Sequence, residues 1–130
     1  MTNNQACPCG AKQDYLHCCG RYIEGQETAP TAEALMRSRY TAYTLQNEPY
    51  LLKTWHDSTR PDTLAMAQDQ FIKWTGLTIK HTERGGEQDN EGIVEFVARY
   101  KLNGKAQKIH EVSQFEKHNG QWLYVNEKAG

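Results

Sequence analysis

Cysteine is absent from residues 20–130 of this 130-residue chain, because all four cysteines come before residue 20. No apolar run approaches the roughly 18–20 residues that a membrane-spanning helix needs, so we expect no membrane span. The formal net charge is only -1, which excludes nucleic-acid binding driven by bulk positive charge. The first residues also lack the charged and apolar segments of a secretory signal, so we expect a cytoplasmic protein.

The cysteines themselves form a compact motif with the spacing C-x-C-x8-C-C, made by Cys7, Cys9, Cys18 and Cys19. Two close pairs bracket a short polar loop, and this arrangement suits a tetrahedral metal ion that takes two ligands from each pair. Four thiolates typically form a closed structural zinc site, and iron is an alternative that accepts the same ligands. His17 is an alternative ligand in place of Cys18 or Cys19.

The thiols have two other potential uses. Disulfides are typical of small secreted domains, but no secretion signal supports them and a bridge between Cys18 and Cys19 would be strained. Redox chemistry is another use, although the chain has no C-x-x-C motif. Because about 20 residues cannot bury a sufficient core, metal binding would supply the folding free energy, on the order of 10 kcal/mol. Gly10 and Gly20 follow the two pairs, and we expect turns with positive φ there.

The cysteine motif, with Pro8, Gly10 and Lys12 among its residues, resembles the SEC-C motif, which is the zinc-binding tail of the SecA translocase ATPase. Three further phrases, at residues 35–43 (LMRSRYTAY), 54–61 (TWHDSTRP) and 110–115 (HEVSQF), extend the match over nearly the whole chain to the bacterial YchJ family. The resemblance implies a SEC-C module fused to a nuclear transport factor 2-like domain, without a settled activity.

The same resemblance implies protein partners for the module, such as the SecB chaperone or ribosomes. Lys12, Tyr15 and Arg21 would form the contact surface. We therefore expect the metal-binding motif in residues 1–24 and the nuclear transport factor 2-like domain in residues 31–130. The polar, turn-rich residues 25–30 between them are typical of a linker.

Helical patterns dominate the first half of the second domain. Thr31 is the expected N-cap of a helix that runs to about residue 46, because Leu35, Met36 and Tyr40 recur at helical spacing. A short second helix is expected from about residue 47 to residue 55. A third is expected over residues 64–76. His56 and Asp57 follow the second helix, where capping is their expected role.

After Gly76 the apolar residues alternate, which is typical of strands. Asn103-Gly104 and Asn119-Gly120 each predict a tight hairpin. The expected strands begin at residue 77 and then span residues 93–102, 105–117 and 121–126. Three helices followed by a four-strand antiparallel meander make an α+β domain. The family resemblance implies the same architecture, a curved sheet wrapped around helices to form a cone.

Counting outward from the first hairpin pairs Phe96 with Glu111 and Val94 with Ser113, and counting from the second pairs Ser113 with Asn126. The helix-facing side of the sheet is therefore expected to form a pocket. Its predicted lining is Tyr40, Tyr43, Phe96, Tyr100, Glu111, Ser113, Phe115 and Tyr124. The opposite face is mixed in polarity, so it is either solvated or covered by a second copy in a homodimer.

Glu111 is the one candidate catalytic residue. A carboxylate among apolar neighbours is costly unless it is paired, and burial raises its pKa toward the range of a general acid or base. The structural alternative is that Arg37, Arg39 or a tyrosine hydroxyl satisfies it.

Catalytic motifs are otherwise missing, since the chain has no nucleophile elbow, P-loop or Rossmann fingerprint. The favoured hypothesis is therefore a non-enzymatic adaptor that acts in translation or protein export through its metal-bound motif. One alternative is a cone pocket around Glu111 that binds or transforms a small molecule. The other is a metal-handling or thiol-redox protein.

Overall fold

The computed structural model describes residues 6–11, 13–64 and 72–127. Its elements are η1 (Tyr15–His17), α1 (Gly20–Ile23), α2 (Ala32–Thr44), α3 (Glu48–Lys53), β1 (Ile72–Arg84), β2 (Glu91–Leu102), β3 (Lys105–His118) and β4 (Gln121–Glu127). The strands form one antiparallel sheet in the order β1-β2-β3-β4, which confirms the predicted α+β class. Within the described ranges, no helix has the length and apolar character needed to cross a membrane.

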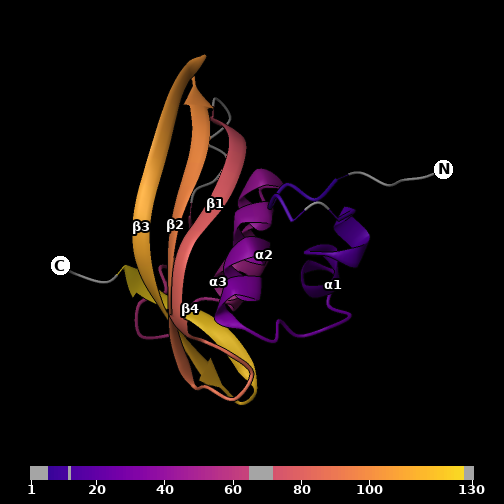
Figure 1. Cartoon of the computed structure of the whole chain (residues 1–130), viewed down its shortest axis with the longest axis vertical. Helices are drawn as coiled ribbons and strands as arrows, with labels where there is room; N and C mark the ends of the chain where they lie inside the picture. The colour runs from indigo at the N-terminus through magenta and orange to yellow at the C-terminus, as the bar shows by residue number, and fades with distance from the viewer. Residues whose placement is uncertain (1–5, 12, 65–71, 128–130) are drawn as a thin grey trace.

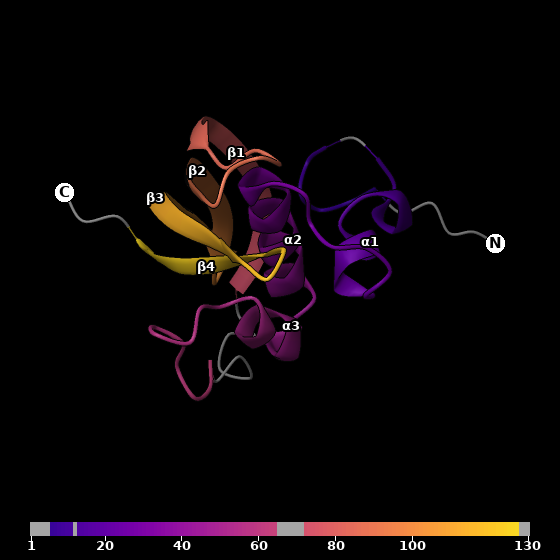
Figure 2. The ribbon, with the colours of Figure 1, turned by 90° about the horizontal axis from the view of Figure 1, so that it is seen from below.

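Helix α2 lies between the curved sheet and the N-terminal segment (Figures 1 and 2). It begins as predicted, because the Thr31 hydroxyl accepts a hydrogen bond from the Ala34 amide at 3.0 Å. A helix covered on two sides must bury residues nearly all round its axis. Accordingly α2 buries polar Ser38, which donates to the Leu35 carbonyl at 2.7 Å and bonds the Tyr50 hydroxyl at 2.7 Å.

Both predicted hairpins are tight turns with left-handed backbone. Asn103 and Gly104 have φ of 53° and 83°, and the second Asn-Gly pair has 53° and 79°, as expected for type I′ turns. The predicted pairing of Phe96 with Glu111 is confirmed. The pairing of Ser113 with Asn126 is wrong by one residue. The register shifts between Gln114 and Phe115, so Ser113 faces Glu127.

The predicted third helix is corrected at its C-terminal end. Residues 72–76 already belong to β1, which begins five residues earlier than expected. Residues 65–71 of that prediction lie outside the described residues. The alternation of β1 is interrupted by a register shift between Trp74 and Gly76, which hid the strand pattern in the sequence.

The side chains of Val94, Phe115 and Trp122 are at most 2% exposed and form the centre of the core between sheet and helices. The Trp122 indole also donates to the Pro30 carbonyl at 3.2 Å, which fixes the segment before α2. On the outer face of the sheet, Val112 and Val125 are half-buried. A homodimer through that face stays a prediction.

Candidate functional site

The four cysteine side chains lie together on the side of α2 that faces away from the sheet. Cys7 and Cys9 precede η1, whereas Cys18 and Cys19 follow it, so this short 3-10 helix brings the pairs together. All four sulfur atoms lie within 4.8 Å of one another. The side chains are 0–7% exposed, and all four are free thiols.

This geometry fits a tetrahedral metal ion. With metal–sulfur bonds of about 2.3 Å, the sulfur atoms of a tetrahedron are about 3.8 Å apart. Cys9 Sγ lies 3.5 Å from Cys18 Sγ, and Cys18 Sγ lies 4.0 Å from Cys19 Sγ, so the two distances bracket that value. The four cysteines can therefore hold one metal ion without a large rearrangement.

The thiols affect one another's pKa values in opposite directions. Hydrogen bonds from Cys19 and Cys9 lower the pKa of Cys7. The hydrogen bond to Cys7 raises the pKa of Cys19, and burial raises the pKa of Cys18 to about 12. Without a cation, Cys18 and Cys19 therefore stay protonated. Four adjacent thiolates need a cation among them, and binding one releases the protons.

Helix α2 anchors the cysteine segment through two residues one turn apart. The Arg37 guanidinium donates to the Cys9 carbonyl at 2.9 Å and also pairs with Glu33 at 3.0 Å. The Thr41 hydroxyl lies 3.6 Å from Cys7 Sγ, within hydrogen-bonding range of sulfur. Such contacts around metal ligands fix their orientation. Neither contact could be predicted from the sequence, because helical spacing identifies only the apolar face of α2.

Of the two glycines of the motif, Gly10 confirms the expected positive φ and Gly20 does not. Gly10 has a φ of 84°, so its turn uses the left-handed region as expected. Gly20 instead begins α1 with an ordinary helical φ, and a Cβ atom there would lie 2.7 Å from the Tyr15 carbonyl oxygen. Gly20 is therefore required for close approach of η1 to α1, and not for a positive φ.

The remaining candidates of this segment lie on its surface. The His17 ring is 81% exposed and bonds the Asp14 carboxylate at 2.8 Å, away from the four sulfur atoms. Arg21 donates to the Cys18 carbonyl at 3.0 Å, and the Tyr15 hydroxyl donates to Glu24 at 3.0 Å. Lys12 lies outside the described residues.

A cavity of about 300 Å³ opens between α2 and the concave side of the sheet. Six of the predicted pocket residues line it: Tyr40, Tyr43, Phe96, Tyr100, Glu111 and Tyr124. Ser113 and Phe115 are buried beside it, at 0% and 1% exposure, and are not among its lining residues. Trp74 completes an aromatic wall, because its ring lies 5.8 Å from that of Tyr40 and 5.3 Å from that of Tyr100.

Glu111 and Arg39 both line this cavity without forming the predicted pair. Burial raises the pKa of Glu111, whose Oε2 accepts from the Ser113 hydroxyl at 3.1 Å. The Arg39 guanidinium donates instead to the Leu51 carbonyl and the Thr54 hydroxyl. Burial and the Glu111 carboxylate raise the pKa of Tyr124 to about 12. Arg37 is occupied by Glu33, as described above.

A second group of side chains that could hold a metal ion was not predicted from the sequence. His56, Glu116 and His118 lie together although 60 residues of chain separate the first two. The capping role expected for His56 and Asp57 is wrong, because α3 ends at Lys53 with Thr54 as its C-cap. No local pattern could have found this group, since it depends on how the segment after α3 packs on β4.

Known proteins match this chain in both sequence and fold. A family model described as "YchJ, middle NTF2-like domain" matches residues 31–127. A UPF0225 protein of Chromobacterium violaceum is 54% identical over 123 residues, covering 93% of this chain and 90% of that protein. A UPF0225 protein of Streptomyces coelicolor is 45% identical over 120 residues and is covered to 92%.

Two solved structures share the architecture. The solution structure of a SEC-C motif containing protein from Rhodopseudomonas palustris has a TM-score of 0.84 at 33% identity, covering 95% of this chain and 98% of that one. The crystal structure of a SEC-C motif containing protein from Psychrobacter arcticus has a TM-score of 0.79 at 27% identity, covering 97% and 84%. The chain therefore belongs to the YchJ family, with UPF0225 proteins as its homologues and SEC-C motif proteins as its structural neighbours.

Proposed function

We propose that Cys7, Cys9, Cys18 and Cys19 hold one Zn²⁺ and that the metal-folded segment is a docking surface for a protein partner. The observation that carries the proposal is the cluster of four buried sulfur atoms on a segment anchored to α2. A closed site of four thiolates is structural, because no coordination position stays open for a substrate. The burial of the sulfur atoms also disfavours the metal-exchange and thiol-redox alternatives.

The surface of this segment carries one exposed large apolar side chain among polar neighbours. Leu16 in η1 is 55% exposed, and the neighbouring His17 is more exposed still. A partner protein that docks on this segment would bury the Leu16 side chain. By its resemblance to the SecA tail, the module has the SecB chaperone and ribosomes as the first partners to test. The role that we propose for this chain is therefore that of an adaptor protein in the cytoplasm.

Leu16→Glu is expected to weaken binding of purified SecB or ribosomes at least tenfold, because a charge replaces the exposed apolar contact. The measurement is biolayer interferometry with the intact, zinc-loaded chain. Leu102→Glu is the matched control, since Leu102 is also exposed, at 40%, but lies at the β2–β3 hairpin. Equal binding by the two variants would exclude η1 as the docking surface.

The cavity supports a second candidate function, the binding of a small, largely apolar molecule. Aromatic rings line most of its wall, and the few polar groups include Glu111, Arg39 and the Tyr124 hydroxyl. Pockets that combine apolar walls with a few convergent polar groups are the usual sites for small molecules. Glu111 would then be a positioning group or a general acid or base. Its half-buried carboxyl would be kept for function at a cost in stability.

Glu111→Gln is expected to raise the free energy of unfolding near neutral pH, by less than about 1 kcal/mol because the side chain is only half-buried. The folded-state pKa is raised, so protonated Glu111 stabilises the fold below about pH 4.5 and this contribution is lost as pH rises through the raised pKa. The gain should therefore shrink on acidification.

Urea denaturation at several pH values measures this effect. Glu95→Gln is the control, because Glu95 lies on the opposite face of the sheet and pairs with His110 at 2.7 Å. The Glu95→Gln variant should show no gain in the free energy of unfolding. A loss of more than about 1 kcal/mol for Glu111→Gln would show instead that the carboxylate is a structural hydrogen-bonding partner.

A further inference from the structure

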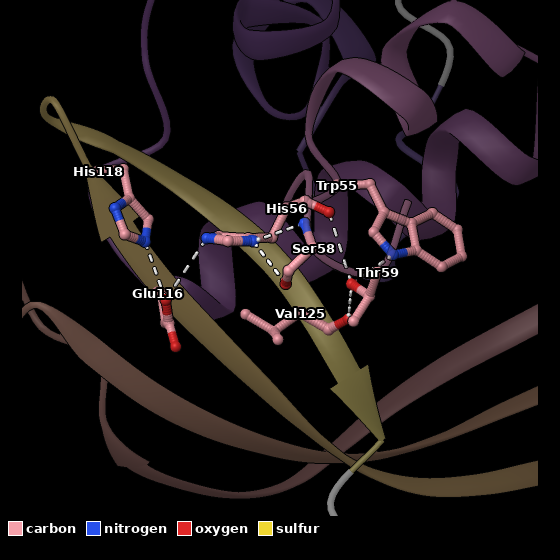
Figure 3. A network of polar contacts seen from close by, with 7 residues as sticks. All are labelled: Trp55, His56, Ser58, Thr59, Glu116, His118 and Val125. Carbon is pink, nitrogen blue, oxygen red and sulfur yellow. Dashed lines mark hydrogen bonds and ion pairs between the residues drawn. The ribbon is translucent and has the colours of Figure 1, made fainter. Parts of the chain in front are cut away.

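Two histidines and one glutamate converge at the end of the sheet where β3 and β4 meet the segment after α3 (Figure 3). Glu116 and His118 are two residues apart on β3, so their side chains project from the same face of the strand. His56 comes from the segment after α3. None of the three belongs to the cysteine centre or to the cavity.

The backbone holds His56 in place. Its amide donates to the Tyr124 carbonyl at 2.8 Å, and the Tyr124 amide donates to the Thr54 carbonyl at 2.8 Å. Three residues after His56, the Thr59 hydroxyl donates to the Val125 carbonyl. The segment therefore runs along the free edge of β4 like a short additional strand, and it places the His56 side chain beside β3 (Figure 3).

The ligand atoms are spaced as a metal ion would require. Glu116 Oε1 lies 2.8 Å from His118 Nε2 and 3.8 Å from His56 Nε2. Nitrogen and oxygen ligands at about 2.0–2.2 Å from Zn²⁺ stand about 3.3–3.6 Å apart in a tetrahedron. The two distances span that range, and the three ligand atoms all lie within 4.8 Å of one another.

The orientation of His56 is fixed from its other nitrogen. Nδ1 lies 2.8 Å from the Ser58 hydroxyl oxygen and 3.0 Å from the Ser58 amide nitrogen, which leaves Nε2 directed at Glu116. Metal-binding histidines usually donate the N–H of the second nitrogen to an acceptor, and here the Ser58 hydroxyl oxygen is the group that can accept it. Because the Ser58 amide donates to Nδ1, the neutral ring carries its proton on Nε2 in the metal-free state. Metal binding at Nε2 requires that proton to leave Nε2 and Nδ1 to be protonated from solvent. The Nδ1–H then donates to the Ser58 hydroxyl oxygen, and the hydrogen bond from the Ser58 amide is given up.

Other histidines of the sheet show what is particular about this group. His110 pairs with Glu95 at 2.7 Å, and His81 pairs with Glu83 at 3.7 Å. Among the described residues, no third metal-binding side chain lies close to either pair. Within residues 6–11, 13–64 and 72–127, only the group of His56 has a third ligand from a distant part of the chain.

We propose that His56, Glu116 and His118 form a second metal site, which binds a divalent transition-metal ion such as Zn²⁺. Two imidazoles and one carboxylate are a common ligand set for these ions. The side chains are 25–48% exposed, so a fourth coordination position faces solvent. The site is thus open, in contrast to the closed cysteine centre, and a water molecule or an external ligand can occupy that position.

Isothermal titration calorimetry on the full chain tests the proposal. The cysteine centre is first filled with one equivalent of Zn²⁺, and further Zn²⁺ is then added. We expect a second binding event of one ion per chain. His118→Ala and His56→Ala should each weaken this event at least tenfold, whereas the control His110→Ala should leave it unchanged. Long-range proton–nitrogen spectra should show the His56 ring protonated at Nε2 before binding and at Nδ1 after it.

The proposal is overturned if the wild-type chain shows no second event. It is equally overturned if His118→Ala leaves that event unchanged or if His110→Ala weakens it as much. Because the His118 side chain is 48% exposed, its replacement should not disturb the fold. An unchanged amide spectrum and retention of the first Zn²⁺ check this. His118→Gln provides a second variant that should lose the event in the same way.

Discussion

Replacement of Cys9 by serine is expected to abolish tight zinc binding and to unfold the cysteine segment while the sheet stays folded. Cys9 is 0% exposed and is one of four ligands to the proposed ion. Metal binding supplies on the order of 10 kcal/mol in structural zinc sites of this size, and the short segment has no comparable core of its own. The sheet and α2 keep their own core around Val94, Phe115 and Trp122.

The loss should also reach α2, because the segment covers one side of that helix and bonds Arg37 and Thr41. We expect a decrease in Tm of about 10 °C or more. Ala42→Ser is a matched control. It places a similar hydroxyl at a position of 0% exposure without removing a ligand. The proposal would be contradicted if the Cys9→Ser chain still bound one zinc ion. It would also be contradicted if the Tm of that chain fell no further than the Tm of the Ala42→Ser control.

Arg39→Ala is expected to lower the free energy of unfolding by about 3–5 kcal/mol. The Arg39 side chain is 3% exposed, and its Nη1 donates to the Leu51 carbonyl at 2.8 Å and the Thr54 hydroxyl at 2.7 Å. Its guanidinium also stacks 5.1 Å from the ring centre of Trp55 and 4.8 Å from that of Tyr124. One side chain thus joins α2, the end of α3 and β4, and its loss leaves buried acceptors unsatisfied.

Arg39→Lys should lose much of the same stability, because an ammonium group lacks the planar fork that bonds two oxygens and stacks on rings. Urea denaturation followed by circular dichroism measures both variants. Arg99→Ala is the control, since Arg99 is exposed and donates to the Thr78 hydroxyl at 3.0 Å. It should change stability by less than about 0.5 kcal/mol. A similarly small change for Arg39→Ala would show that the buried guanidinium does not hold these elements together.

Local signals in the sequence predicted the features that depend on few neighbouring residues. The two Asn-Gly pairs predicted the hairpins, because left-handed φ values are accessible to these residues. The pairing of β2 with β3 followed by counting. The same counting failed for β3 and β4 beyond Gln114. A register shift that no residue in the sequence indicates places Ser113 opposite Glu127 there.

Features that depend on packing between distant elements were not accessible in the same way. The partner of Glu111 is Ser113 on its own strand, because the donors of Arg39 turn toward α3. The two buried sides of α2 blurred its amphipathic pattern. His56 lies close to Glu116 because the segment after α3 pairs with β4. The periodicity of apolar residues in the sequence does not indicate such a contact.

The central claim is that the four cysteines form one zinc centre. X-ray absorption at the zinc edge, on the full chain loaded with one equivalent of Zn²⁺, tests it most directly. We expect one tightly held zinc ion per chain, with four sulfur ligands at about 2.3 Å. A first shell with nitrogen or oxygen ligands at this stoichiometry, or a chain that retains no zinc, would contradict the account.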